Sequence, residues 1–161
     1  MKINTLGALA AVALLAACSS TPPATTSSTG SSGMTAPAAT GPVPGSEEDL
    51  VANVGDRVFY EFNKSTLSDE AQATLTKQAA FLAKYPADKI ELAGNCDDRG
   101  TEEYNLALGN RRAKAAEDFL VAKGVSASRI TTISYGKDRP TALGDNDSAW
   151  AQNRNAITSV K

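Results

Sequence analysis

Histidine is missing from this chain of 161 residues, and so are an excess of basic charge and any long apolar run. Without histidine the chain lacks the commonest general base and the commonest metal ligand, so we expect no metal or other cofactor. Lysine and arginine number 16 against 18 aspartates and glutamates, whereas a nucleic-acid partner requires a basic face. These absences argue against a metalloenzyme and against a nucleic-acid-binding protein.

The apolar run nearest the N-terminus extends from Leu6 to Ala17 and is only 12 residues long. A membrane-spanning helix needs about 20 residues, so this run after Lys2 is typical of a signal-peptide core. The residues from Leu15 to Cys18 are similar to the lipobox of bacterial lipoproteins. That similarity implies cleavage before Cys18 and acylation of this cysteine, and Ser19 implies transport to the outer membrane. The alternative is a secretory signal followed by a chance cysteine.

A stretch without charge follows the leader. Residues 19–46 contain only two larger apolar side chains, Met34 and Val43. Such a segment cannot bury enough apolar surface to offset the entropy lost on ordering, which predicts a tether. We therefore divide the chain into a signal peptide (1–17), a lipidated cysteine with its tether (18–53) and a folded domain (54–161). Residues 47–53 are compatible with a short helical lead-in to that domain.

The domain alternates strand and helix patterns. A helix capped by Ser68 stops before Pro86, a second is capped by Thr101 and ends at Gly124, and one helical turn is expected around 148–152. Strands are expected at 57–62, 89–94, 130–135 and 155–160. The order βαβαβ(α)β predicts an α+β fold, a two-layer sandwich with the helices on one face of a small mixed sheet.

Charged and hydrogen-bonding side chains gather between the second strand and the second long helix. Asp97 lies in the turn that feeds this helix, and Asn105, Gly109 and Arg112 are spaced to share one helix face. With Gly109 leaving a notch, these residues would form a small concavity in which the guanidinium binds a carboxylate and Asp97 binds an ammonium group. The pattern also fits an ordinary ion pair between Asp97 and Arg112, and most such pairs are structural.

The spacing of this stretch resembles a known family. The residues from Gly94 to Ala113 follow the pattern G-x-x-D-x-x-G-x-x-x-Y-N-x-x-L-x-x-x-R-A, which is similar to the signature of the OmpA-like peptidoglycan-binding domain. The motif is long and has fixed spacing, so it is far more specific than a lone glycine pattern. The resemblance covers roughly residues 56–161. Together with the leader, it extends to the peptidoglycan-associated lipoproteins of Gram-negative envelopes and implies the OmpA-like form of the sandwich.

The resemblance assigns roles to five residues. In similar domains, the residues that match Asp97 and Arg112 bind meso-diaminopimelate of the peptidoglycan stem peptide. Arg112 is therefore expected to hold a carboxylate of this ligand and Asp97 its ammonium group. Asn105 is expected to line the same pocket. The turn after the first strand, with Phe62 and Asn63, is expected to supply backbone N–H groups and a wall.

The function that the resemblance implies is binding and tethering, without catalysis. The protein would be anchored in outer-membrane lipid through Cys18, face the periplasm, hold peptidoglycan non-covalently and act with Tol-system proteins in envelope integrity and cell division. One alternative is an OmpA-like envelope lipoprotein outside that system. Another is a peptidoglycan hydrolase using the paired carboxylates of Asp97 and Asp98, although adjacent residues on a turn rarely point together across a substrate.

The chain departs from the family pattern in two places. Asn95 and Cys96 stand where the family often has His-Thr, and Asn155 stands where it often has the second arginine of an N-R-R pattern. Cys96 has no histidine to act as its base, so we expect a buried structural thiol. A nucleophile and an intermolecular disulfide are the other two interpretations.

Overall fold

Four strands form a mixed sheet in the computed structural model, which describes residues 41–161. In chain order they are β1 (Arg57–Phe59), β2 (Ile90–Asn95), β3 (Ile130–Gly136) and β4 (Asn155–Val160). Their spatial order is β1-β4-β2-β3. β4 runs antiparallel to both of its neighbours, and β2 and β3 run parallel. The last strand of the chain therefore lies inside the sheet, next to the first.

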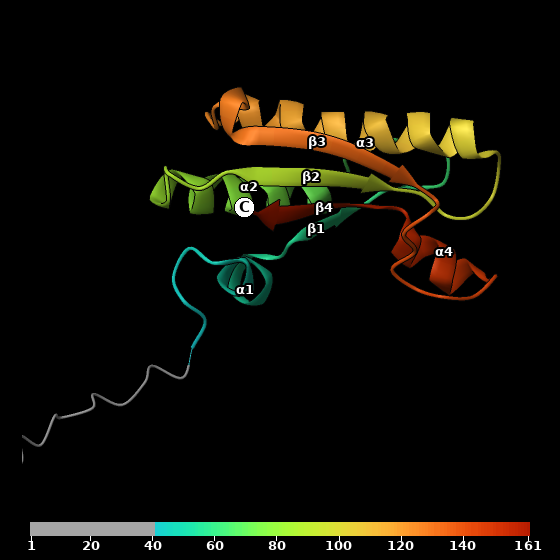
Figure 1. Cartoon of the computed structure of the whole chain (residues 1–161), viewed down its shortest axis with the longest axis horizontal. Coiled ribbons are helices and arrows are strands. Elements are labelled where there is room, and N and C mark those ends of the chain that lie inside the picture. Colours follow the sequence, from blue (N-terminus) through green and yellow to red (C-terminus); the bar gives the residue numbers. More distant parts are fainter. Residues whose placement is uncertain (1–40) are drawn as a thin grey trace, which may run out of the picture. The chain divides into compact units, whose positions relative to one another are not determined.

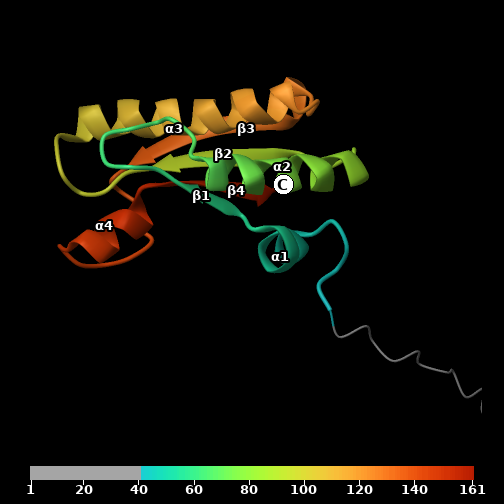
Figure 2. The same cartoon turned by 180° about the vertical axis from the view of Figure 1, so that it is seen from behind.

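Two long helices cover one face of this sheet (Figures 1 and 2). They are α2 (Asp69–Lys84) and α3 (Glu102–Ala122). α3 packs on β2 and β3, and α2 packs on β1. A third helix, α4 (Asp147–Asn153), lies at the end of the sheet where β4 begins. The α+β two-layer sandwich expected from the sequence is confirmed.

The hydrophobic core fills the space between the sheet and the two long helices. Ile90 and Leu92 alternate along β2 and are 1% and 0% exposed, as a strand buried on one face requires. Leu75 and Leu120 meet them from α2 and α3 and are both fully buried. Each such side chain contributes about 1.5–3 kcal/mol through burial. The core residues lie between Leu50 and Ala156, so the segment 41–161 carries a core of its own.

Helix starts follow the sequence closely. The hydroxyl of Ser68 accepts from the N–H of Ala71, and that of Thr101 accepts from the N–H of Tyr104, both at 3.2 Å. These are the two caps that the sequence predicted. The first strand is shorter than expected, because only the N–H of Tyr60 continues the ladder, to the carbonyl of Arg154 at 2.9 Å. Phe62 therefore lies in the loop after β1 and is 57% exposed.

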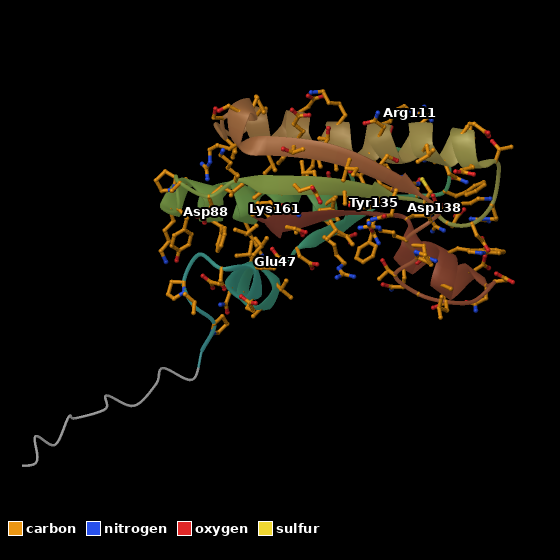
Figure 3. The ribbon with its side chains drawn as sticks, viewed as in Figure 1. Glu47, Asp88, Arg111, Tyr135, Asp138 and Lys161 are labelled. Atoms are coloured by element: carbon orange, nitrogen blue, oxygen red, sulfur yellow. The ribbon has the colours of Figure 1, made fainter. Side chains whose placement is uncertain are left out.

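A helical segment precedes the first strand, where a lead-in was expected. It consists of α1 (Glu47–Asp49) and the π-helical turn η1 (Leu50–Val54). Leu50 is 1% exposed and belongs to the core, and Glu47 accepts from the N–H of Val160 at the end of β4 (Figure 3). The packed unit thus begins ahead of residue 54. The expected signal peptide, Cys18 and most of the tether lie outside the described residues.

Within residues 41–161, no helix combines the length and the apolar character needed to cross a bilayer.

Candidate functional site

A cavity of about 180 Å³ opens where β2 passes into α3. Its volume suits one small charged group rather than a large ligand. The five residues predicted to form a ligand site all line it, and their role in binding stays a prediction. The complete lining is Phe62, Asn63, Cys96, Asp97, Arg99, Gly100, Tyr104, Asn105, Leu108 and Arg112.

Arg112 is the most deeply placed charged side chain of the site and is 0% exposed. Its Nε donates to the carbonyl of Lys64 at 2.9 Å, and Nη1 donates to the carbonyl of Asn95 at 2.8 Å. Nη1 also lies 3.4 Å from Cys96 Sγ, and Nη2 donates to the carbonyl of Glu61 at 3.2 Å. Four of the five guanidinium N–H groups thus have protein acceptors. Burial lowers the pKa of Arg112 from its ordinary value, but a guanidinium remains charged in proteins.

The ion pair considered between Asp97 and Arg112 is not formed in the described part of the chain. Asp97 Oδ2 instead accepts from Arg99 Nη2 at 2.6 Å and lies 3.4 Å from Arg154 Nη1. The reason is geometric, because backbone carbonyls already surround the guanidinium of Arg112. Arg154 is itself fixed, since its Nε donates to the carbonyl of Tyr60 at 3.0 Å.

Gly109 does not leave a notch for a ligand, so that part of the sequence interpretation was wrong. A Cβ built on Gly109 would lie 2.7 Å from the carbonyl oxygen of Gly94 and 2.3 Å from Ser134 Oγ. The missing side chain instead lets α3 approach β2 and β3 closely. Asn105, Gly109 and Arg112 do share the buried face of α3, as their spacing predicted.

Asn105 and Cys96 hold the turn between β2 and α3. Asn105 Nδ2 donates to the carbonyls of Arg99 and Thr101 at 2.9 and 3.1 Å. Cys96 is 2% exposed, and its thiol lies 3.4 Å from the carbonyl of Asn105. Burial raises the pKa of Cys96, which disfavours the thiolate that a nucleophile requires. The expected burial of the Cys96 thiol is confirmed.

Sequence reasoning missed the aromatic contacts of Arg99. Its guanidinium carbon lies 4.1 Å from the ring centre of Phe62 and 4.1 Å from that of Trp150. The position of Arg99 two residues after Asp97 could have indicated their ion pair. Trp150 is distant in sequence, and only the fold brings it to Arg99. On the same side of the cavity, the hydroxyl of Tyr104 donates to Asn63 Oδ1. Asn63 adopts a left-handed backbone conformation, with φ of 58°.

Two guanidinium groups therefore contact one buried carboxylate, and a third lies in the wall of the same cavity. Arg99 and Arg154 contact Asp97, and Arg112 lines the same cavity. The charged residues that line the cavity are two arginines and one aspartate, so the cavity is suited to a ligand that presents a carboxylate. Asp98 is exposed, and this geometry gives it no shared access with Asp97 to a substrate. The described residues contain no group of three or more acidic, cysteine or histidine side chains that would hold a metal ion.

Most of the folded part of the chain is similar to one protein family. The model of the OmpA family matches residues 59–154, which is more than half of the chain. The chain belongs to the OmpA family. The peptidoglycan-associated lipoprotein of Rhizobium meliloti is 52% identical to it over 126 residues, which cover 78% of this chain and 70% of that one. The one from Brucella melitensis is 51% identical over 129 residues, covering 80% and 75%.

Solved structures of OmpA-like domains agree with this assignment. The crystal structure of the peptidoglycan-associated lipoprotein from Burkholderia pseudomallei has a TM-score of 0.64 and 40% identity, covering 66% of this chain and 90% of that chain. The C-terminal domain of Helicobacter pylori MotB has a TM-score of 0.62 at 20% identity, covering 66% and 84%, and it shows the fold alone. The resemblance to peptidoglycan-associated lipoproteins is confirmed.

The two departures from the OmpA-like pattern contact one another. Asn95 Nδ2 donates to Asn155 Oδ1 at 2.8 Å, and both side chains are buried. Asn155 Nδ2 in turn donates to the carbonyl of Gln152 at 2.7 Å and to Thr141 Oγ1 at 3.0 Å. The two buried amide side chains thus bond to each other and to neighbouring groups, as buried polar groups normally do. The carbonyl of Asn95 remains available to Arg112.

Acid should weaken this OmpA-like domain through Asp97. Burial alone would raise the pKa of its carboxyl, but the hydrogen bond and charge of Arg99, with Arg154, hold that pKa below its ordinary 3.8. A lowered pKa contributes stability that is complete above the unfolded pKa and lost as the pH falls through the folded pKa. We therefore expect Asp97→Asn to be less stable than wild type at neutral pH, and the difference to shrink as the pH falls below 3.8.

Urea unfolding at a series of pH values measures this difference. Asp98→Asn is the matched control, because it removes the same charge from the exposed neighbouring residue. It should remain within about 0.5 kcal/mol of wild type at neutral pH. If the destabilisation caused by Asp97→Asn were the same at every pH, the ion pairs of Asp97 would not be its source.

Proposed function

We propose that this chain is an outer-membrane lipoprotein that tethers the outer membrane to peptidoglycan. In this proposal the cavity between β2 and α3 binds meso-diaminopimelate of the stem peptide non-covalently. Arg112 binds a carboxylate of the ligand and Asp97 its ammonium group, while Asn105, Phe62 and Asn63 shape the pocket. The protein catalyses no reaction. Its relatives carry the name peptidoglycan-associated lipoprotein, which supports the ligand class.

One observation carries the binding proposal. Arg112 is fully buried at the wall of a cavity and has no carboxylate partner among residues 41–161. A buried charge without a counter-charge is costly, and a ligand carboxylate would supply one. One N–H of Arg112 Nη2 also has no acceptor among the described residues. Asp97 lines the same cavity. Its carboxylate supplies the negative charge that the ammonium group of a zwitterionic ligand needs.

The anchor and the partners rest on sequence and family. Cys18 follows a lipobox-like sequence, so we propose that it is acylated and inserted in the outer membrane. The uncharged tether gives the lipid and the wall independent positions, because such a segment spans a variable distance. By its relationship to peptidoglycan-associated lipoproteins, we further propose that the protein acts with Tol-system proteins in envelope integrity and cell division. A pull-down from envelopes separates this from an OmpA-like lipoprotein outside that system.

Co-sedimentation with purified sacculi that contain diaminopimelate tests the binding site. Residues 41–161 should pellet with the sacculi, and Asp97→Asn should stay in solution, because it removes the charge that pairs with the ligand ammonium. A charged hydrogen bond contributes about 1.5–3 kcal/mol, so the loss in affinity should be roughly ten- to a hundredfold. Asp98→Asn should pellet like wild type, since its side chain is exposed outside the cavity lining.

Circular dichroism of each variant shows whether it is folded. If folded Asp97→Asn pelleted as well as wild type, the ligand would not contact Asp97 and the wall-binding surface would lie elsewhere. The same incubation also tests the hydrolase alternative. Soluble muropeptides released by wild type but not by Asp97→Asn would favour that enzyme over a binding protein.

A further inference from the structure

Arg99 lines the cavity and contacts two aromatic rings. Its guanidinium lies between the rings of Phe62 and Trp150, 4.1 Å from each ring centre. Contacts of this kind between a cation and an aromatic face are attractive. The same guanidinium donates through Nη2 to Asp97 Oδ2 at 2.6 Å. Arg99 thus places an internal positive charge on the carboxylate proposed to bind the ligand's ammonium group.

Arg99 is the more exposed of the two arginines that contact Asp97. Arg154 is 16% exposed in its side chain, reaches Asp97 at 3.4 Å and is fixed through Nε to the carbonyl of Tyr60. The side chain of Arg99 is 35% exposed and hydrogen-bonds only to Asp97 among the described residues. Gly100 follows it in a left-handed conformation, with φ of 94°. The shorter contact to Asp97 is therefore made by the more exposed side chain, which donates to no backbone carbonyl among the described residues.

The present arrangement of Arg99 is not fully satisfied. Its Nε is buried and has no hydrogen-bond partner among residues 41–161, and neither has the indole Nε1 of the adjoining Trp150. Buried donors without acceptors oppose the favourable contacts around them. Moving Arg99 towards solvent would hydrate its Nε while breaking one ion pair and two ring contacts. The two unsatisfied donors thus offset part of the free energy that holds Arg99 on Asp97.

We propose that Arg99 is an internal competitor of the ligand, occupying the ammonium subsite on Asp97 until a ligand displaces it. This inference rests on the proposed function, in which Asp97 binds an ammonium group. It has two consequences. Arg99 lowers the affinity of the site, because each binding event breaks its pair with Asp97. It also restricts the ligand to one with a full positive charge, because a neutral group cannot replace the guanidinium on the carboxylate.

Titration with the tripeptide L-Ala-γ-D-Glu-meso-diaminopimelate tests this in residues 41–161, with calorimetry and tryptophan emission recorded together. Trp150 is the single tryptophan of the chain, so its emission reports on the contact with Arg99. In wild type, binding should shift the emission to longer wavelength as Arg99 leaves the ring. The same tripeptide acetylated on the side-chain amine of its diaminopimelate should give no shift.

Arg99→Ala should bind the tripeptide about five- to tenfold more tightly, from the ion pair and ring contacts that no longer need to be broken. Its emission should already lie at longer wavelength and change little on binding. Arg111→Ala is the matched control, because Arg111 is exposed on α3 and points away from the sheet (Figure 3). That variant should match wild type in affinity and in emission.

The outcomes separate this inference from the proposed function. Weaker binding by folded Arg99→Ala would mean that Arg99 contacts the ligand directly, and would overturn the competitor role while leaving the binding site in place. Unchanged binding with an unchanged emission response would also overturn it. If wild type, Arg99→Ala and Arg111→Ala all failed to bind the tripeptide, the proposed function would fall and the competitor role with it.

Discussion

Arg112→Ala is expected to destabilise the domain by about 3–5 kcal/mol, in addition to abolishing wall binding. The guanidinium is fully buried and donates to the carbonyls of Glu61, Lys64 and Asn95. Its removal leaves three acceptors without donors, each costing about 1–3 kcal/mol where water cannot reach. It also releases the loop after β1 from α3. Domains of this size are stable by only about 5–15 kcal/mol, so the variant should unfold at much lower urea concentration.

Urea unfolding followed by circular dichroism measures this loss. Arg111→Ala is the matched control, since it deletes the same side chain one position away on the exposed face of α3. It should stay within about 0.5 kcal/mol of wild type. Arg112→Lys keeps the charge but not the planar fork of donors. Its stability should therefore lie between those of Arg112→Ala and Arg111→Ala. Unfolding of Arg112→Ala at the same urea concentration as Arg111→Ala would show that the three carbonyls find other donors.

This dual role of Arg112 affects how a binding experiment is interpreted. A loss of binding in Arg112→Ala reports on folding as well as on ligand contact, because the same guanidinium holds the site together. Asp97 is the better probe, since Asp97→Asn changes the charge of a side chain at nearly constant size. Asp97 and its exposed neighbour Asp98 therefore give the clearer comparison, both in acid and in sedimentation with sacculi.

Gly94→Ala is expected to destabilise the domain about as much as Arg112→Ala does, for a steric reason. A Cβ on Gly94 would lie 1.9 Å from the carbonyl oxygen of Gly109 and 2.6 Å from its carbonyl carbon. The obstructing atoms belong to the backbone of α3, so no side-chain rotation relieves the clash, and the helix must move off β2. Overpacking of a core typically costs about 1–3 kcal/mol and more where backbone shifts. We expect a loss of stability of at least about 3 kcal/mol. We also expect Arg112 to be displaced from its carbonyl acceptors.

Thermal unfolding of Gly94→Ala and Gly109→Ala measures the effect from both sides of the contact. Gly41→Ala makes the same chemical change at a position where a Cβ meets nothing within 4 Å. That variant should have the same Tm as wild type. If Gly94→Ala had the same Tm as Gly41→Ala, the close approach of α3 to β2 would not be needed for stability. Binding of the tripeptide by a folded Gly94→Ala would show that Arg112 keeps its position when the helix moves.

Local features of this chain could be predicted from the sequence because local physics decides them. Ser68 and Thr101 cap their helices as expected, since a hydroxyl two or three residues before a free amide needs no distant partner. The buried face of α2, which includes Leu75 and Leu82, and the four strands follow from apolar spacing. The length and spacing of the motif from Gly94 to Ala113 were specific enough to indicate the OmpA family.

The partners of the charged residues could not be predicted in this way. Asp97 and Arg112 looked like an ion pair, because opposite charges near one another in sequence invite that interpretation. In the fold, Arg112 meets carbonyls 17, 48 and 51 residues away, and Asp97 meets Arg154, which is 57 residues away. Which of several arginines contacts one carboxylate depends on where strands and loops meet. Spacing along a helix carries no information about that.

The sequence by itself determined the helices, the strands, the α+β class and the family. It also indicated which residues gather at the end of β2, because capping, periodicity and a motif of fixed spacing are properties of neighbouring residues. Only the tertiary structure decided that Gly109 serves helix packing, that Arg112 is held by backbone carbonyls and that Arg99 lies between Phe62 and Trp150 on Asp97. The physical reason is that these contacts join segments distant in sequence, and packing of the whole chain determines which side chains meet.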